Sequence, residues 1–227
     1  MKARRKKRKL AAYYPLLWML AIPVLNICYG LLNQDRGNVS SLLTSFDVNI
    51  QFVPGFIIPY LLWYPFIIGM LVVFFMKNKT AYYRTLLSLC MGLVLCYITY
   101  FIFQTTVLRP SIDPNQGILM MLVNFVYQTD APYNCFPSIH VLSSYVILKG
   151  LADCPQAARA IRIGTWVMSW LIIASTLFVK QHVWADVVGA IVLVEVVYYA
   201  VKRWIPARES KSPARAQIFN NKQKSLT

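Results

Sequence analysis

The sequence predicts an all-α fold, a six-span transmembrane helical bundle, and three observations support this. The first is composition: 58% of the 227 residues are hydrophobic and 14% are charged, against about 45–50% and about 25% in a soluble domain. The second is that the apolar residues form long runs, since about 20 of them cross the roughly 30 Å hydrocarbon core as a helix. The third is that the alternating segments of about 10 residues typical of membrane β-barrels are absent.

The apolar runs place six spans in order along the chain. Their predicted bounds are 13–32, 56–76, 86–107, 140–151, 164–179 and 184–204. The fourth is short for a span, so it either begins earlier, near Phe136, or lies tilted inside the bundle. The first two spans contain prolines, which helices in lipid tolerate better than soluble helices do. These are Pro15, Pro23, Pro59 and Pro65.

The distribution of basic residues orients the chain and argues against nucleic-acid binding. The net charge is +15, but the 23 Lys and Arg fall into the segments outside the spans, in chain order, as 7, 1, 3, 1, 3, 1 and 7. Cytoplasmic segments of membrane proteins carry the excess of Lys and Arg. We therefore predict a multi-pass cell-membrane protein with both termini in the cytoplasm and the three sparsely charged loops outside.

A single membrane domain, residues 13–205, is expected between two basic ends. Residues 1–12 form a basic cytoplasmic segment, and residues 206–227 form a polar, disordered cytoplasmic tail. Both ends are expected to rest on anionic lipid headgroups, with solvated tails that have no partner as the alternative. The first apolar run ends at Asn33 without a small-residue cleavage pattern, which indicates a retained span rather than a signal peptide.

Two outer loops are long enough to have structure of their own. Residues 33–55 mix apolar and polar positions and form either an amphipathic segment in the membrane interface or an ordinary packed loop. Residues 108–136 contain an apolar stretch, 117–126, that predicts a helix along the surface. The five cysteines indicate no disulfide framework, although Cys28 and Cys135 both lie toward the outer side and a pairing between them is open.

Candidate catalytic residues gather at the outer ends of the later spans. His140 begins the fourth span and His182 precedes the sixth, and these are the only two histidines. Arg109 and Lys180 are the isolated basic residues at the same level. Asp186 follows His182 at the i,i+4 spacing of one helix face, so the carboxylate is expected to orient the imidazole. Any one of these residues alone is also typical of an interfacial anchor or a loop start.

The segment that ends at His140 predicts an anion site. Ser138 is a good helix N-cap, and the free N–H groups that follow it, beginning at Ile139, lie at the positive end of a helix. His140 would stand over a bound anion and hand it a proton, while Arg109 and Lys180 would neutralise its other oxygens. This combination favours a phosphoryl group, whose transfer depends mainly on positioning and charge stabilisation.

The same residues resemble the type 2 phosphatidic acid phosphatase superfamily. The resemblance rests on three short motifs in the correct order and on the six-span layout. It implies that His182 attacks phosphorus to form a phosphohistidine, that Asp186 orients it, and that His140 protonates the leaving oxygen. It also implies a phosphate-binding role for Ser175 and Thr176, and no metal or organic cofactor. The motifs are Arg109-Pro110, Pro137-Ser138-Ile139-His140, and Ser175, His182 and Asp186.

The chain departs from the family pattern at three positions. Ile102 stands where the first motif usually has lysine, Thr176 where the third has arginine, and Ile139 where the second has glycine. Two phosphate-binding cations are therefore missing, and Lys180 is the candidate substitute for one of them. The pattern is similar to the branch that contains inositol phosphorylceramide synthase-like proteins.

The leading hypothesis is a lipid phosphatase that hydrolyses a lipid phosphate or diphosphate at the outer membrane face. A lipid phosphotransferase with a hydroxyl acceptor on the same site is the alternative, and an inactive relative is a third reading. A transporter or structural membrane protein would instead carry charges along a path through the bundle. Glu195 is the only deep ionisable group, and it is interpreted as structural.

Overall fold

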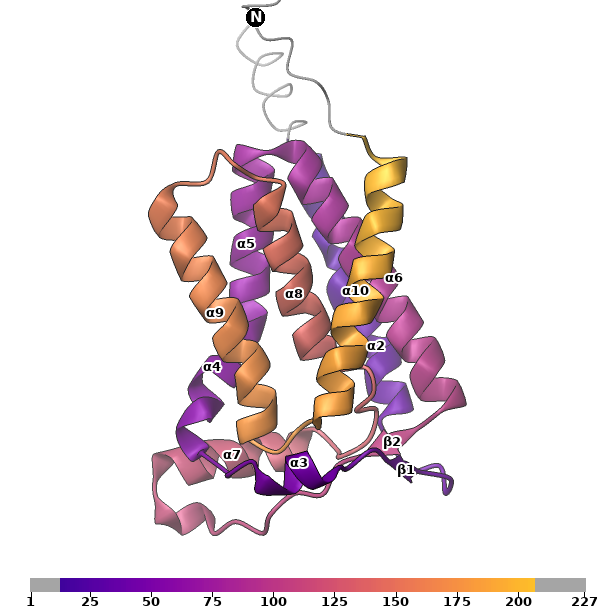
Figure 1. The fold of residues 1–227 in the computed structure, drawn as a ribbon, viewed down its shortest axis with the longest axis vertical. Coiled ribbons are helices and arrows are strands. Elements are labelled where there is room, and N and C mark those ends of the chain that lie inside the picture. The colour runs from indigo at the N-terminus through magenta and orange to yellow at the C-terminus, as the bar shows by residue number, and fades with distance from the viewer. Residues whose placement is uncertain (1–12, 207–227) are drawn as a thin grey trace, which may run out of the picture.

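A computed structural model describes residues 13–206 of the protein and confirms the predicted all-α membrane bundle (Figure 1). The predicted basic ends therefore lie, apart from residue 206, outside the described residues. Three of the elements, η1 to η3, are short 3-10 helices. In chain order the elements are η1 (Tyr14–Leu20), α2 (Ala21–Leu32), β1 (Ser40–Ser41), α3 (Ser45–Asn49), η2 (Pro54–Phe56), α4 (Ile57–Leu61), α5 (Trp63–Lys77), α6 (Lys79–Ile102), β2 (Thr105–Thr106), η3 (Pro114–Gln116), α7 (Ile118–Thr129), α8 (Ile139–Ala152), α9 (Arg159–Phe178) and α10 (Trp184–Trp204).

The bundle is built around α8. This helix packs against α5, α6, α9 and α10, and α2 packs on the outside of α6. Figure 1 shows α3, α7 and the two short strands at one end of the bundle, and the two ends of the described chain, residues 13 and 206, at the other. We call the first of these the α7 end. All three of the sparsely charged loops lie at the α7 end.

Five helical segments are long and apolar enough to cross a membrane, and α8 is shorter. With 14 residues, α8 is about 21 Å long at 1.5 Å per residue, less than the roughly 30 Å hydrocarbon core. The short fourth span expected from the sequence thus corresponds to a buried central helix, and the count of six spans stays a prediction. The five long segments are Tyr14–Leu32, Pro54–Lys77, Lys79–Ile102, Arg159–Phe178 and Trp184–Trp204.

The predicted bounds of the third span were wrong. The helix runs from Lys79 to Ile102 rather than over residues 86–107. It begins early because the Asn78 side chain accepts a hydrogen bond from the backbone N–H of Ala81 at 3.1 Å, which caps a polar first turn. It ends early because β2 leaves the helix direction and pairs in parallel with β1. Arg109 therefore lies in a loop and not at a helix end.

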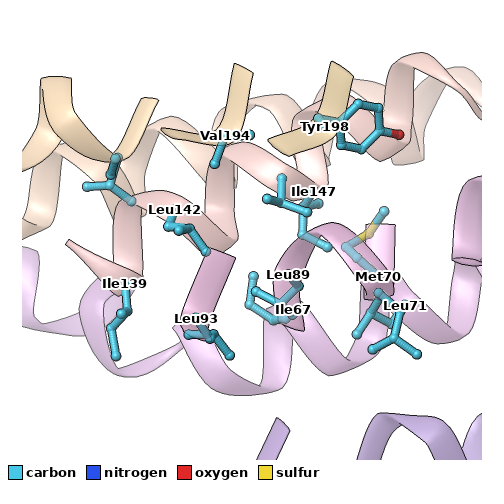
Figure 2. Close-up of a cluster of buried hydrophobic side chains, with 14 of the residues drawn as sticks. Ile67, Met70, Leu71, Leu89, Leu93, Ile139, Leu142, Ile147, Val194 and Tyr198 are labelled. Carbon is cyan, nitrogen blue, oxygen red and sulfur yellow. The ribbon is translucent and has the colours of Figure 1, made fainter. Parts of the chain in front are cut away.

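Close packing holds α8 in the centre. Figure 2 shows Leu142 and Ile147 of α8 among the side chains of α5, α6 and α10. A Cβ atom on Gly150 would lie 2.1 Å from the hydroxyl oxygen of Thr85 on α6. A Cβ on Gly92 of α6 would in turn lie 2.8 Å from Leu142. Glycine at these positions lets the two helices approach closely, as small residues do between membrane helices.

A cluster of charges ties the helices together at the opposite end from α7. The Asp153 carboxylate is 2.7 Å from Arg84 of α6 and 2.9 Å from Lys202 of α10. It also accepts a hydrogen bond from the Tyr198 hydroxyl at 2.9 Å. Burial alone would raise the pKa of Asp153, but the hydrogen bonds from Lys202, Arg84 and Tyr198 outweigh it and lower the pKa. The cluster thus joins α6 and α10 to the connection after α8.

Glu195 also links two helices through hydrogen bonds, which agrees with the structural role expected from the sequence. Its carboxylate accepts hydrogen bonds from Lys149 at 2.7 Å and from the Tyr145 hydroxyl at 2.7 Å, both on α8. The pair links α8 to α10 along the side of the bundle.

The two long loops cover the α7 end. The helix predicted over residues 117–126 is present as α7, and it runs across the end of the bundle (Figure 1). The loop 33–55 contains the short helix α3. Cys28 and Cys135 are both free, so the open disulfide pairing between them is not formed.

Candidate active site

The beginning of α8 is fixed against the beginning of α10. The Ser138 hydroxyl accepts a hydrogen bond from the backbone N–H of Val141 at 3.4 Å, so Ser138 is the N-cap that its sequence position predicts. The backbone N–H of Ser138 donates to the carbonyl of Asp186 at 3.3 Å. Nearby, a Cβ on Gly189 would lie 2.3 Å from the Phe136 ring, so glycine is needed for this close approach. The capped start of α8 is thereby placed beside Asp186.

His182 and Asp186 form the predicted pair by a different geometry from the one expected. His182 lies in the turn before α10 and not on the helix face, and α10 begins at Trp184. The Asp186 carboxylate accepts a hydrogen bond from the backbone N–H of Val183 at 3.0 Å. The same oxygen is 3.1 Å from Nδ1 of His182. The carboxylate thus caps the helix and occupies Nδ1, which leaves Nε2 of His182 as the free nitrogen.

The turn that carries His182 is held by the end of α9. The backbone N–H groups of Gln181 and His182 both donate to the carbonyl of Thr176, at 3.0 and 3.1 Å. Lys180 precedes these two residues and has a positive backbone φ of 54°. Residues other than glycine adopt this conformation rarely. The His182 side chain is only 8% exposed. Both features make the nucleophile candidate part of a rigid turn.

His140 is buried between aromatic rings. Its ring stacks on Tyr60 with centroids 4.4 Å apart and lies 4.2 Å from the Trp63 ring. The Trp63 indole N–H donates to the Ser143 hydroxyl at 2.6 Å, which fixes that ring. His140 and His182 have ring centroids 6.1 Å apart. The two histidines, separated by 42 positions in the sequence, therefore face one small region at the α7 end.

The two isolated cations and His182 line one cavity of about 260 Å³. Arg109 donates to the backbone carbonyls of Asp130 at 2.7 Å and Tyr127 at 3.3 Å, and it also bonds the Gln181 side chain. Lys180 donates to the backbone carbonyl of Asp47 at 3.0 Å. Within residues 13–206, neither cation forms an ion pair with a carboxylate, so both are placed to bind an anion in the cavity.

The remaining predicted phosphate-binding residues lie differently. The hydroxyls of Ser175 and Thr176 are fully buried and donate to carbonyls one turn back in α9, those of Ile172 and Ile173. Thr176 reaches the site through its carbonyl instead. Ile139 is buried in the first turn of α8, and its side chain joins the hydrophobic core.

Asp47 belongs to the site although the sequence pattern did not single it out. It is 3% exposed, and its carboxylate accepts a hydrogen bond from the backbone N–H of Trp184, two residues after His182, at 2.7 Å. Burial alone would raise the pKa of Asp47, but hydrogen bonds from Thr44 and Trp184 lower it. The signal available in the sequence was the capping box of Thr44 and Asp47.

Cys135, His182 and Asp186 have donor atoms that all lie within 4.8 Å of one another, a group that could hold a metal ion. Burial and the neighbouring Asp186 carboxylate raise the pKa of the Cys135 thiol well above 9.0. A metal ion bound here would have to displace the thiol proton, because a cysteine binds metal as the thiolate. Nδ1 of His182 is also already engaged by Asp186. The donor set thus fits a hydrogen-bonded acid–histidine pair better than a metal site.

The comparison with protein families gives one match. The family model described as the PAP2 superfamily matches residues 81–210. This range begins in α6 and includes Arg109, His140, His182 and Asp186, and it leaves out α2 to α5. No curated protein and no solved structure matches the chain.

Proposed function

Because this chain belongs to the PAP2 superfamily, whose members are phosphatases or phosphotransferases, we propose that it is an integral membrane lipid phosphatase. The substrate is a membrane lipid phosphate or diphosphate, which is cleaved at the outer membrane face through a phosphohistidine intermediate. The proposal depends on one observation: His182, whose Nδ1 is held by Asp186, lines the same cavity as Arg109 and Lys180. The branch with inositol phosphorylceramide synthase-like proteins stays a prediction.

In the first step, Nε2 of neutral His182 attacks phosphorus. An N–P bond forms while the bond between phosphorus and the leaving oxygen breaks, and protonated His140 gives its proton to that oxygen. The attack requires about 3–3.5 Å between the reacting atoms and the proton transfer about 2.6–3.2 Å. The centroids of the two imidazole rings are 6.1 Å apart, so both rings flank the position that we propose for the phosphoryl group.

The negative oxygens of the phosphoryl group need charge stabilisation that is in place before the reaction. Arg109 and Lys180 supply two positive charges, and both are held in position by backbone carbonyls. The first turn of α8 after Ser138 adds free N–H groups at the positive end of a helix. This set of donors takes the place of the cations that the family pattern has at Ile102 and Thr176.

In the second step, a water molecule attacks the phosphohistidine. His140, now neutral, takes a proton from the water, the N–P bond breaks, and inorganic phosphate leaves. A lipid or other alcohol in place of water would make the chain a phosphotransferase, and the same residues would act in the same roles. We keep transfer as the second candidate because the missing cations set the site apart from the usual phosphatase pattern.

The proposal is tested on purified protein by measuring phosphate released from phosphatidate, phosphatidylglycerophosphate and polyprenyl diphosphates. Release from at least one of them is expected, and His182→Ala should abolish it. Asp113→Asn, at an exposed site in the loop before α7, is the matched control and should keep full activity. No release from any substrate by a folded protein, or full activity of His182→Ala, would contradict the proposal.

A second measurement separates hydrolysis from transfer and detects the intermediate. A lipid substrate with a labelled phosphoryl group is mixed with the protein, and the chain and all products are analysed. Label is expected on His182 at early times and then in free phosphate. Label that ends in a new lipid ester would favour the phosphotransferase.

A further inference from the structure

A second cavity, of about 300 Å³, is lined in part by His140. It is bounded by α2, α4, α7 and the first turn of α8, and His182 is not among its lining residues. One part of its wall is polar, with Asn26, Tyr29 and Asp130, whereas Leu61 and Phe125 are apolar and substantially exposed. The cavity thus combines a polar wall near His140 with an apolar rim on the side of the bundle.

Asp130 connects this second cavity to the phosphate cavity. Its backbone carbonyl accepts the 2.7 Å hydrogen bond from Arg109. One carboxylate oxygen, Oδ1, accepts hydrogen bonds from the Tyr29 hydroxyl at 2.7 Å and from the Asn33 amide at 2.8 Å. The other oxygen, Oδ2, accepts none from the part of the chain that the structure describes. A carboxylate oxygen without a donor is ready to accept a hydrogen bond from a ligand hydroxyl.

His140 is a polar side chain in the wall of the second cavity. The residue is only 8% exposed, and its ring contacts those of Tyr60 and Trp63. A hydroxyl group in this cavity therefore lies next to the proposed acid.

The geometry of phosphoryl transfer indicates which part of the substrate binds in the second cavity. The attacking and leaving atoms lie roughly in line on opposite sides of phosphorus. If His182 attacks from the first cavity, the leaving alcohol departs on the side of His140. The acceptor that later breaks the N–P bond must enter from that same side. The second cavity is therefore next to the alcohol in both steps.

We propose that the second cavity is the alcohol subsite of the enzyme and that Asp130 favours an alcohol with an additional hydroxyl group. The inference rests on the proposed phosphohistidine function and adds the class of alcohol to it. The reacting hydroxyl lies at His140 and the additional hydroxyl donates to Oδ2 of Asp130. An apolar tail, where there is one, leaves past Leu61 and Phe125. Polyol compounds are thus preferred over simple alcohols, both as leaving group and as acceptor.

The acceptor step is balanced without any further reactant. The alcohol oxygen forms a bond to phosphorus, the N–P bond to His182 breaks, and the proton of the alcohol moves to His140. When water takes the place of the alcohol, the same changes give inorganic phosphate. The ratio of phosphate ester to inorganic phosphate therefore measures how well an alcohol occupies the subsite once the phosphohistidine has formed.

The test uses the full chain in detergent with dioctanoyl phosphatidate as donor. Ethylene glycol or ethanol is added at equal concentration, and the ratio of phosphate ester to inorganic phosphate is measured for each. The wild type is expected to favour ethylene glycol by about tenfold, the factor of one hydrogen bond to a charged group. Without any subsite, ethylene glycol would be favoured by a factor of two, because it has two equivalent hydroxyl groups and ethanol has one. In Asp130→Asn the preference should fall to that factor.

Asp130→Asn is a conservative change, because the amide oxygen of the asparagine can still accept the hydrogen bonds from Tyr29 and Asn33. The amide nitrogen takes the place of Oδ2, and it can donate a hydrogen bond but cannot accept one. Asp113→Asn carries the same substitution at an exposed position and should keep the wild-type ratio. If Asp130→Asn does not fold, Tyr29→Phe removes one donor that holds the carboxylate, and it should lower the preference to a smaller extent.

A second arm tests the leaving group with intact lipids. Phosphatidylglycerophosphate releases an alcohol that has an additional hydroxyl, and phosphatidate releases one that has none. Asp130→Asn should reduce kcat/KM for the first by about tenfold relative to the second. An equal loss on both lipids, together with an unchanged alcohol ratio, would overturn the subsite. Absence of any phosphate release by the wild type would instead overturn the proposed function.

Discussion

At the scale of single residues, Asp186 shows how one side chain serves both fold and chemistry. The spacing of His182 and Asp186 predicted a contact along one helix face. The contact exists, but it arises because Asp186 turns back to cap the first turn of α10 and His182 sits just outside that turn. A residue before a helix is held by the capping geometry, whereas a residue on the helix face would depend on its rotamer alone. The proposed nucleophile is therefore oriented by the start of the helix.

The two histidines predict a bell-shaped dependence of activity on pH. His182 must be neutral to attack, so activity falls as the pH decreases and that ring gains a proton. His140 must be protonated to donate, so activity also falls as the pH increases. The measurement is kcat/KM as a function of pH. A flat profile would speak against two working histidines.

Asp47 is expected to support catalysis as a positioning residue. Asp47→Ala removes the side-chain acceptor for the backbone N–H of Trp184. The contact of Lys180 with the backbone carbonyl of residue 47 stays, so the turn with His182 loses only part of its support from α3. We expect kcat to fall about 10- to 100-fold, with a smaller change in KM, because a misplaced nucleophile affects the chemical step. Asp47→Asn keeps one acceptor oxygen and should recover part of kcat.

The same carboxylate gives a pH test with a defined sign. The pKa of Asp47 is lower in the folded chain than its ordinary value of 3.8. Its hydrogen bonds therefore contribute stability above about pH 3.8, and this contribution is lost as the pH falls through the folded-state pKa. Thermal unfolding of the wild type and Asp47→Asn between about pH 3 and 7 should converge at the acid end. Curves that stay equally far apart at every pH would contradict this role.

At the scale of elements, α8 depends on its close contact with α6. Gly150→Ala places a methyl group 2.1 Å from the Thr85 hydroxyl oxygen and 2.8 Å from the Phe74 ring. Because both neighbours are buried, overpacking should cost about 1–3 kcal/mol of stability. The matched control is Gly164→Ala in α9, where nothing lies within 4 Å of the added atom. The control should be neutral or stabilising in thermal unfolding, and equal losses for both variants would contradict the packing argument.

At the scale of the whole molecule, the bundle separates the charged end from the reactive end. The Asp153 cluster, Lys77 and Arg162 lie at the end where the described chain begins and finishes, and the two histidines lie at the α7 end. This separation is consistent with the orientation that the basic residues predict. For the proposed lipid phosphatase, we expect the phosphate of the substrate to lie at the headgroup level of one leaflet.

The orientation is testable by labelling intact cells with a membrane-impermeant maleimide. Asn115→Cys, in the loop before α7, should be labelled from outside the cell. Gln156→Cys, between α8 and α9, is also exposed and should react only after the membrane is opened. The opposite pattern would reverse the proposed orientation, and both results are read against the unsubstituted chain with its own cysteines.

The sequence by itself determined the fold class and the approximate spans, and it supplied the residues that we propose to carry the chemistry. Apolar length and charge alternation are local properties, and the motif residues are recognisable by type and spacing. Only the tertiary structure decided the early start of α6, whose second turn contains a buried Arg84 paired with Asp153. It also decided the place of Asp47 and of the second cavity beside Asp130. These depend on contacts between segments far apart in the chain, which no local pattern of residues contains.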